Sequence, residues 1–212
     1  MVSSDVERDN GNGIRDAHRI LHLLSRYCKD FGEGGKFEVF PKLDGLPAYR
    51  YLDQIAGYDG LQIWRSVMRG FALRVQWERN YRTFTIREDR PSKAITEYDK
   101  RMMAVEHSDD GYMFPHWTIQ AYMDLPGGSI FSIGLAKTRE LYPWIKQIEL
   151  NGHKFYRNRP HNAEETFFSV SWDMYRMSNL FFYEYSPPIE HIGIDESERV
   201  VANPDERPWQ AL

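Results

Sequence analysis

Three short runs of β-forming residues follow one another within the segment 53–87, and this pattern restricts the fold more than any other part of the chain. The runs are separated by turn-forming residues, and they span Leu61–Met68, Phe71–Glu78 and Tyr81–Arg87. Arg69-Gly70 is the expected turn between the first two runs. Strands joined by turns of a few residues pair antiparallel with their neighbours in sequence. The segment therefore predicts a three-stranded antiparallel meander.

The rest of the chain alternates helical and extended patterns around this meander. Apolar residues at helical spacing predict helices over about 14–30, 93–107 and 138–149. Alternating or continuous apolar runs predict strands over about 117–123, 130–136 and 166–172. This order indicates an α+β fold, with a central mixed, largely antiparallel sheet flanked by helices.

Length and composition limit the domain organisation. The chain has 212 residues, of which 42% are apolar, so it is long enough to bury the core of one domain. We expect a flexible N-terminus over 1–13, a single domain over 14–186 and an acidic, irregular tail over 187–212. The single cysteine, Cys28, excludes an intramolecular disulfide and a zinc site built from several cysteines. No signal peptide and no apolar run of about 20 residues is seen, so we expect a cytoplasmic protein without a membrane span.

Charge is distributed unevenly along the chain, although its net charge is only -4. Residues 65–101 contain ten Lys or Arg against five Asp or Glu, whereas residues 184–206 contain seven acids and one base. The overall balance excludes a uniformly basic nucleic-acid binder. The basic central segment instead favours a local anion-binding site.

An acidic turn and a polar row within the segment 53–87 give the main functional clue. Asp59 precedes a glycine at a turn, and Arg74, Gln76 and Glu78 occupy alternate positions of the second run. In a strand these three side chains project from one face. A carboxylate at the start of one strand and a polar row on the next can hold a metal and a phosphate. In the simpler alternative, the turn is an ordinary β-turn and the row is the solvated face of an amphipathic strand.

The order of helix, β-meander, helix and further strand resembles the core of the PD-(D/E)xK, or restriction-endonuclease-like, nucleases over residues 14–136. The triplet Tyr58-Asp59-Gly60 is similar to the element in which an Asp opens the second core strand of that family. The triplet Arg74-Val75-Gln76 occupies the place of its (Glu/Asp)-x-Lys motif. The resemblance implies bound divalent ions, here Mg²⁺, that activate water against a phosphodiester.

This sequence departs from the family's pattern at both ends of the second triplet. Arg74 stands in place of the acid, and a guanidinium group cannot bind a metal because it has no acceptor. Gln76 stands in place of the lysine. On this resemblance the missing carboxylate would come from Glu78 or Glu97, and Lys100 would supply the cation. The implied catalytic residues are then Asp59, Gln76, Glu78, Glu97 and Lys100. The implied metal ligands are Asp59, Glu78 and Glu97.

Arginines and aromatic residues alternate across the same part of the chain. They could grip phosphates and stack on bases. The arginines concerned are Arg65, Arg69, Arg74, Arg82, Arg87 and Arg90. Gln120 and Tyr122, on the run 117–123, could line a cleft. Glu97 and Arg101 are four residues apart, and a solvated helix face also explains this pair.

Two classes of function remain open. The first is a metal-dependent nuclease, or a nuclease-like protein that binds nucleic acid at its phosphodiesters. The second is a non-enzymatic interaction module, whose aromatic surface and acidic tail would bind a protein partner or another copy within a nucleic-acid-handling assembly. A nuclease requires at least two carboxylates close to one point with cations nearby, whereas an interaction module requires an exposed aromatic patch.

Overall fold

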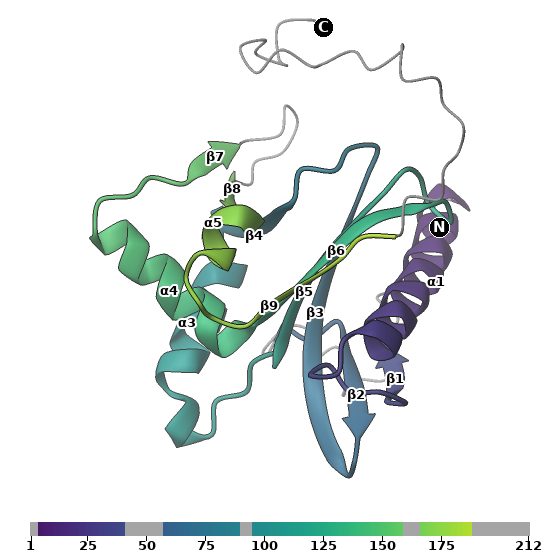
Figure 1. The fold of residues 1–212 in the computed structure, drawn as a ribbon, viewed down its shortest axis with the longest axis horizontal. Coiled ribbons are helices and arrows are strands. Elements are labelled where there is room, and N and C mark those ends of the chain that lie inside the picture. Colours follow the sequence, from purple (N-terminus) through teal and green to yellow (C-terminus); the bar gives the residue numbers. More distant parts are fainter. Residues whose placement is uncertain (1–3, 41–56, 90–94, 159–165, 188–212) are drawn as a thin grey trace, which may run out of the picture.

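Six strands form the central sheet of the computed structural model, which describes residues 4–40, 57–89, 95–158 and 166–187 (Figure 1). The sheet order is β1-β2-β3-β5-β6-β9. The strands are β1 (Lys36–Val39), β2 (Gly60–Trp64), β3 (Val67–Trp77), β5 (Trp117–Met123), β6 (Ile130–Lys137) and β9 (Phe182–Tyr185). Only the β3–β5 pair is parallel, and the other pairs of this sheet are antiparallel. The predicted α+β fold with a mixed, largely antiparallel sheet is confirmed.

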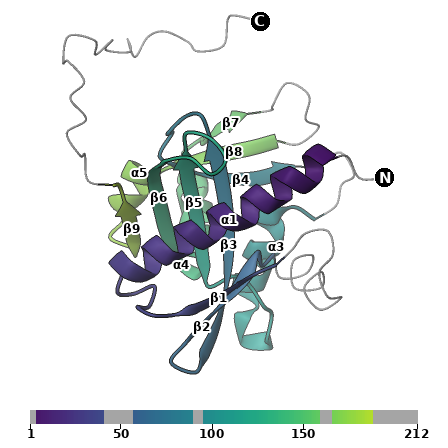
Figure 2. The ribbon, with the colours of Figure 1, turned by 90° about the vertical axis from the view of Figure 1, so that its right-hand side faces the viewer.

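A second, smaller sheet and several helices lie against one face of the central sheet (Figure 1). This sheet has the order β4-β8-β7, formed by β4 (Thr83–Asp89), β8 (Thr166–Ser171) and β7 (Tyr156–Asn158). The helices beside it are α3 (Glu97–Glu106), α4 (Thr138–Leu150) and α5 (Trp172–Arg176). A short 3-10 turn, Ser108–Asp110, follows α3. Helix α1 (Ser4–Tyr27) crosses the opposite face of the central sheet (Figure 2).

The apolar stripe of α1 explains why this helix covers the sheet. Ile20, Leu21 and Leu24 lie on one face at helical spacing, and none of them is exposed to solvent. They pack against residues of β3, β5 and β6 that include Phe71 and Ile133. Every residue of β5 is buried, because α1 covers one face of this strand and the smaller sheet with its helices covers the other.

A second core lies between the central sheet and the smaller one. Tyr122 of β5 and Phe84 of β4 are buried there together with Trp172 of α5. Gly134 of β6 permits this contact, because a Cβ at this position would lie 2.4 Å from the Trp172 ring. Rings from α3, α4 and β8 complete the cluster. Apolar packing therefore holds the smaller sheet at one end of the face.

The predicted meander is wrong in its third strand: β2 and β3 pair antiparallel as expected, but the third member is β1, which pairs with β2. The turn lies at Arg65-Ser66, and β3 continues through the expected turn position at Gly70. Gly70 is required for packing, because a Cβ there would lie 2.5 Å from the ring of Tyr58. The third expected strand, β4, leaves the central sheet and pairs with β8. Positive φ angles of 75° at Glu78 and 50° at Arg82 redirect the chain between β3 and β4.

Two expected helix starts are also wrong. Helix α1 begins at Ser4, so most of the segment predicted to be flexible is helical. Helix α3 begins at Glu97 rather than near residue 93, because the Thr96 side chain and Asp99 form a reciprocal capping box. The predicted C-terminal tail lies outside the described residues, apart from its first residue.

Candidate anion-binding cleft

A cleft of about 1240 Å³ opens between the central sheet and the smaller sheet. Side chains of β3 and β5 form its floor, residues of β4, β7 and β8 form a wall, and α3 closes one end. The cleft continues around the edge of β3 to Asp59 and the N-terminal part of α1. It exceeds the usual volume of a drug-sized ligand site, about 300–1,000 Å³, so it has room for a larger or extended ligand.

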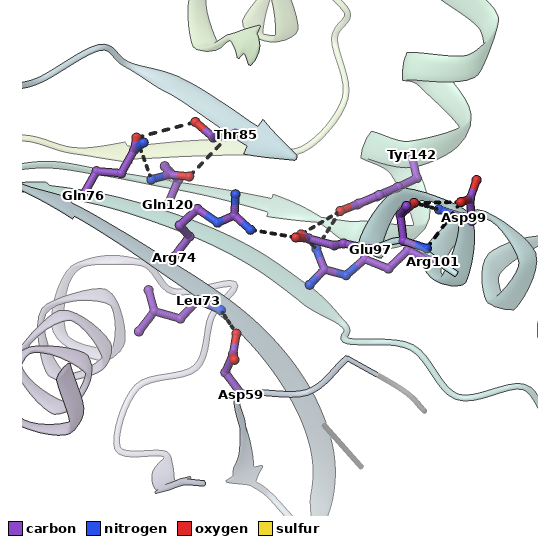
Figure 3. A network of polar contacts seen from close by, with 11 residues as sticks. Asp59, Leu73, Arg74, Gln76, Thr85, Glu97, Asp99, Arg101, Gln120 and Tyr142 are labelled. Atoms are coloured by element: carbon purple, nitrogen blue, oxygen red, sulfur yellow. Dashed lines mark hydrogen bonds and ion pairs between the residues drawn. The ribbon is translucent and has the colours of Figure 1, made fainter. Parts of the chain in front are cut away.

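An acidic side chain at the end of the cleft joins two arginines (Figure 3). Glu97 Oε2 accepts a hydrogen bond from Arg74 Nη2 at 2.8 Å, and Glu97 Oε1 accepts one from Arg101 Nη1 at 2.5 Å. Arg101 Nη1 also donates to the Tyr142 hydroxyl at 2.6 Å. Glu97 is 18% exposed and Arg101 7%, so this group is largely removed from water.

The electrostatics of this group keep its charges in place. Burial alone would raise the pKa of Glu97, but Arg101, Arg74 and Arg87 outweigh burial and hold that pKa below its usual value. Burial would lower the pKa of Arg101, but Glu97 and Tyr142 outweigh it and raise that pKa. Burial raises the pKa of Tyr142, so its hydroxyl stays neutral near pH 7. The end of the cleft therefore holds one carboxylate among several guanidinium groups.

Beyond Phe71, no described strand pairs with β3 on the side of β2. Strand β2 pairs with β3 only as far as Phe71, whereas β5 pairs with it from Phe71 to Trp77. Asp59 lies just before β2, and its Oδ2 accepts a hydrogen bond from the Leu73 backbone N–H at 2.7 Å (Figure 3). Asp59 therefore takes the place that a backbone carbonyl would have if β2 were longer.

Two amide side chains meet in the middle of the cleft. Gln120 Nε2 donates to Gln76 Oε1 at 3.3 Å, and Gln120 Oε1 accepts from the Thr85 backbone N–H at 3.3 Å. Thr85 Oγ1 donates to Gln76 Oε1 at 3.5 Å. Gln120 is buried and Gln76 is half-buried. At Thr85, strand β4 thus contacts the floor of the cleft through polar groups.

Aromatic rings line the wall and the mouth of the cleft. Phe167 of β8 lies close to two guanidinium groups, with Arg74 5.2 Å and Arg87 5.4 Å from its centroid. Trp77, Tyr81 and Tyr156 also line the cleft, and all three are exposed. Flat exposed rings beside cations are suited to stack on a planar ligand that carries negative charge.

Most of the functional residues expected from the sequence line this one cleft, although four separate segments of the chain supply them. They are Asp59, Arg74, Gln76, Arg87, Glu97 and Lys100. Gln120, which was expected to line a cleft, lies in its floor. Tyr122, expected beside it, is instead fully buried in the core between the two sheets.

The other expected residues lie elsewhere. Glu78 does not share the face of Arg74 and Gln76, because β3 ends at Trp77 and Glu78 has a positive φ. It does not line the cleft. Arg82 Nη2 forms ion pairs with Glu184 at 2.9 Å and Asp173 at 3.3 Å outside the cleft. Two more arginines lie at the β2–β3 hairpin, where both stack on Trp64; they are Arg65 and Arg69. The last one, Arg90, lies outside the described residues.

Sequence reasoning missed two residues that shape the cleft. Arg101 was interpreted as part of a solvated helix face, but it is buried and reaches Tyr142 of α4. Its four-residue spacing from Glu97 identifies the pair but gives no information about its burial. Phe167 was expected only as a strand residue, and nothing local indicates that β8 faces Arg74.

The described residues do not fit the implied Mg²⁺ ion. Mg²⁺ takes oxygen ligands and is repelled by neighbouring cations. Both oxygens of Glu97 accept hydrogen bonds from guanidinium groups, and Asp59 Oδ2 accepts one from Leu73. Within the described ranges, no three side chains of the types Asp, Glu, His or Cys gather around one point. No metal-dependent step is therefore derived from this cleft.

Comparison of the chain with protein-family models, curated proteins and solved structures gives no match. No helix in the described part of the chain is long and apolar enough to cross a membrane. The residues of the cleft are accordingly the basis for a proposed function.

Proposed function

We propose that the cleft binds nucleic acid through its phosphate groups. The observation that carries this proposal is the charge of the described lining, which is opposite to that of the whole chain. Its charged members are four cations and two acids, namely Arg74, Arg87, Lys100, Arg101, Asp59 and Glu97. Four positive and two negative charges leave a local balance of +2, whereas the net charge of the chain is -4.

The arrangement of Arg74 supports phosphate binding in particular. A guanidinium group has five N–H donors, and Arg74 uses one of them to bind Glu97 among the described residues. The carboxylate fixes the side chain across the floor of the cleft, and the remaining donors can meet a phosphate in the bidentate manner that arginine favours. Glu97 would therefore position the guanidinium groups of Arg74 and Arg101 for the ligand.

Hydrolysis of the bound phosphodiester stays a prediction from the sequence resemblance. Asp59, Gln76 and Lys100 line the same cleft as the proposed phosphate contacts, so bound nucleic acid would lie next to them. The same samples should therefore be tested for cleavage with and without Mg²⁺. A product that forms only with Mg²⁺ and is lost in Asp59→Ala would support the nuclease function.

Binding is tested by fluorescence anisotropy of labelled oligonucleotides over a salt series. We expect wild-type affinity to fall as salt rises, and Arg74→Ala to reduce the slope of log affinity against log salt by about 1. Arg139→Ala is the matched control, because Arg139 is exposed on α4 and does not line the cleft. No binding by the wild type at low salt, or equal slopes for all three proteins, would contradict the proposal.

One observation favours the second function class, an interaction module. The β2–β3 hairpin exposes three apolar side chains, with 51% of Ile63, 46% of Val67 and 65% of Met68 accessible. Ile63 and Met68 are cross-strand partners, so their side chains are neighbours, and adjacent exposed apolar groups indicate a contact surface. Sedimentation velocity over a concentration series tests self-association through this hairpin. Association that Met68→Asp abolishes would support it, whereas a monomer at all concentrations would exclude another copy as the partner.

A further inference from the structure

The amide cluster Gln76–Gln120–Thr85 has hydrogen-bonding capacity that the described residues do not use. Gln76 Oε1 accepts two hydrogen bonds, from Gln120 and Thr85, at 3.3 and 3.5 Å. No described residue accepts a hydrogen bond from Gln76 Nε2, which has two N–H donors. Gln76 is half-buried and lines the cleft, so these donors face a space that a ligand can enter.

The cluster has a defined place relative to the proposed phosphate contact. Arg74 and Gln76 are two residues apart on β3, which separates their Cα atoms by about 6.6 Å on one face of the strand. In Figure 3 the amide cluster lies on one side of Arg74, and Glu97 lies on the other. A ligand with its phosphate at Arg74 would therefore place its neighbouring groups against Gln76 or against Glu97. The Gln76 side favours uncharged acceptors, because amide groups line it.

The depth of the cluster selects the form of the nucleic acid. Gln120 is 1% exposed, and β4 covers the cluster through Thr85. Bases inside a duplex are paired and stacked, and the backbone would keep them away from groups at this depth. An unpaired base can enter such a site and stack on an aromatic ring. Phe167 and Trp77 line the same cleft and supply such rings.

We propose that Gln76, oriented by Gln120 and Thr85, forms a base subsite that selects single-stranded nucleic acid. A carbonyl oxygen or ring nitrogen of an unpaired base accepts from Gln76 Nε2, while the adjacent phosphate meets Arg74. This inference rests on the proposed function, because it requires the cleft to hold nucleic acid. In this inference Gln76 is a specificity residue that contacts the base.

The test compares three labelled probes of equal length with wild type and Gln76→Leu. The probes are an oligothymidine strand, an abasic strand with the same backbone, and a blunt duplex. We expect wild type to bind the oligothymidine strand more tightly than the other two probes. Gln76→Leu should weaken that binding about tenfold and leave the affinity for the abasic strand unchanged. Gln147→Leu is the matched control, because Gln147 is exposed on α4 and lies outside the cleft.

The outcomes separate this inference from the proposed function. Equal wild-type affinity for the oligothymidine and abasic strands, or tighter binding of the duplex, would overturn the base subsite and leave phosphate binding standing. An equal loss for both strands in Gln76→Leu would do the same. No binding of any probe at low salt would overturn both. Circular dichroism of each variant excludes loss of the fold as the cause.

Discussion

Arg74 on β3 and Glu97 at the start of α3 form a 2.8 Å ion pair that connects the floor of the cleft to the helix at its end. The two side chains are 26% and 18% exposed, so the pair is partly shielded from water. Glu97 also binds Arg101, which is almost fully buried. One carboxylate therefore compensates two guanidinium groups that come from different layers of the fold.

Loss of this carboxylate is expected to destabilise the fold. Glu97→Gln would leave the Arg101 guanidinium buried without its charge partner, which costs about 3 kcal/mol in comparable buried pairs. Urea unfolding measures the change. Glu106→Gln is the control, because its pair with Lys146 is about half exposed and should change stability by less than about 1 kcal/mol. Equal effects of the two substitutions would show that the buried Glu97 pair contributes no more to stability than the exposed Glu106 pair.

The same carboxylate predicts a pH dependence of stability. The pKa of Glu97 is lower in the folded protein than its ordinary value of 4.5. Its contribution is therefore complete above pH 4.5 and is lost as the pH falls through the lower folded-state pKa. The stability difference between wild type and Glu97→Gln should be constant between pH 7 and about pH 5 and shrink at lower pH. Urea unfolding of both proteins across this range measures it, and a difference that persists at the lowest pH would contradict the assignment.

His116 predicts a second pH effect in a different window. Burial, with Arg69 and Lys137 nearby, lowers the pKa of His116 from 6.5 to about 4, and Glu140 opposes this shift. The unfolded chain therefore takes up a proton before the folded one, so stability falls as the pH decreases from 6.5 towards 4. The loss is at most about 3 kcal/mol. His116→Gln should flatten the dependence of stability on pH between pH 6.5 and 4. An NMR titration that shows His116 taking up its proton near pH 6.5 would contradict the lowered pKa.

Gly134 and Gly13 predict opposite effects of the same substitution. Gly134→Ala would place a methyl group against the buried Trp172 ring, which should destabilise the protein by about 1–3 kcal/mol. Gly13→Ala places its methyl group where no atom lies within 4 Å, inside helix α1. It should stabilise the protein by about 0.5–1 kcal/mol, because glycine disfavours helix. Thermal unfolding compares the two, and a shift of the same sign in both variants would contradict these contacts.

The tip of the β2–β3 hairpin stores backbone strain. Arg65 and Ser66 have φ angles of 46° and 65°, although neither is glycine. Ser66→Gly should therefore stabilise the protein by about 0.5–1 kcal/mol, since relief of the left-handed conformation exceeds the added freedom of the unfolded chain. Ser129→Gly, at a residue without a positive φ, should be neutral or destabilising. A loss of thermal stability in Ser66→Gly would show that the turn adopts another conformation.

Local sequence patterns predicted where strands and helices lie, but they did not predict how strands far apart in the sequence pair with each other. Strands β5 and β6 were predicted almost to the residue from two apolar runs. The strand at Thr83–Asp89 was also expected, but its pairing with β8 depends on residues far along the chain and on the positive φ at Glu78. Gly70 could not be interpreted from the sequence either. It is a glycine because the ring of Tyr58 packs against it, and in the sequence such a glycine looks the same as a turn glycine.

The sequence drew attention to several residues that line the cleft, but the contacts between these residues could not be predicted from it. Asp59, Gln76 and Glu97 line one cleft, whereas Glu78 lies outside its lining. Their contacts differ from those expected, because Glu97 faces guanidinium groups. The sequence shows that Arg101 is four residues from Glu97, but only tertiary packing against Tyr142 determines that both are buried.

The pairing of β4 with β8 has a consequence for how the protein is made. Residues 83–89 leave the ribosome early, yet their partner strand ends at Ser171, close to the end of the described chain. Until that strand has emerged, β4 has no neighbour in its sheet and the wall of the cleft is incomplete. A nascent chain that has formed the meander of β1, β2 and β3 therefore still lacks the β8 part of this wall.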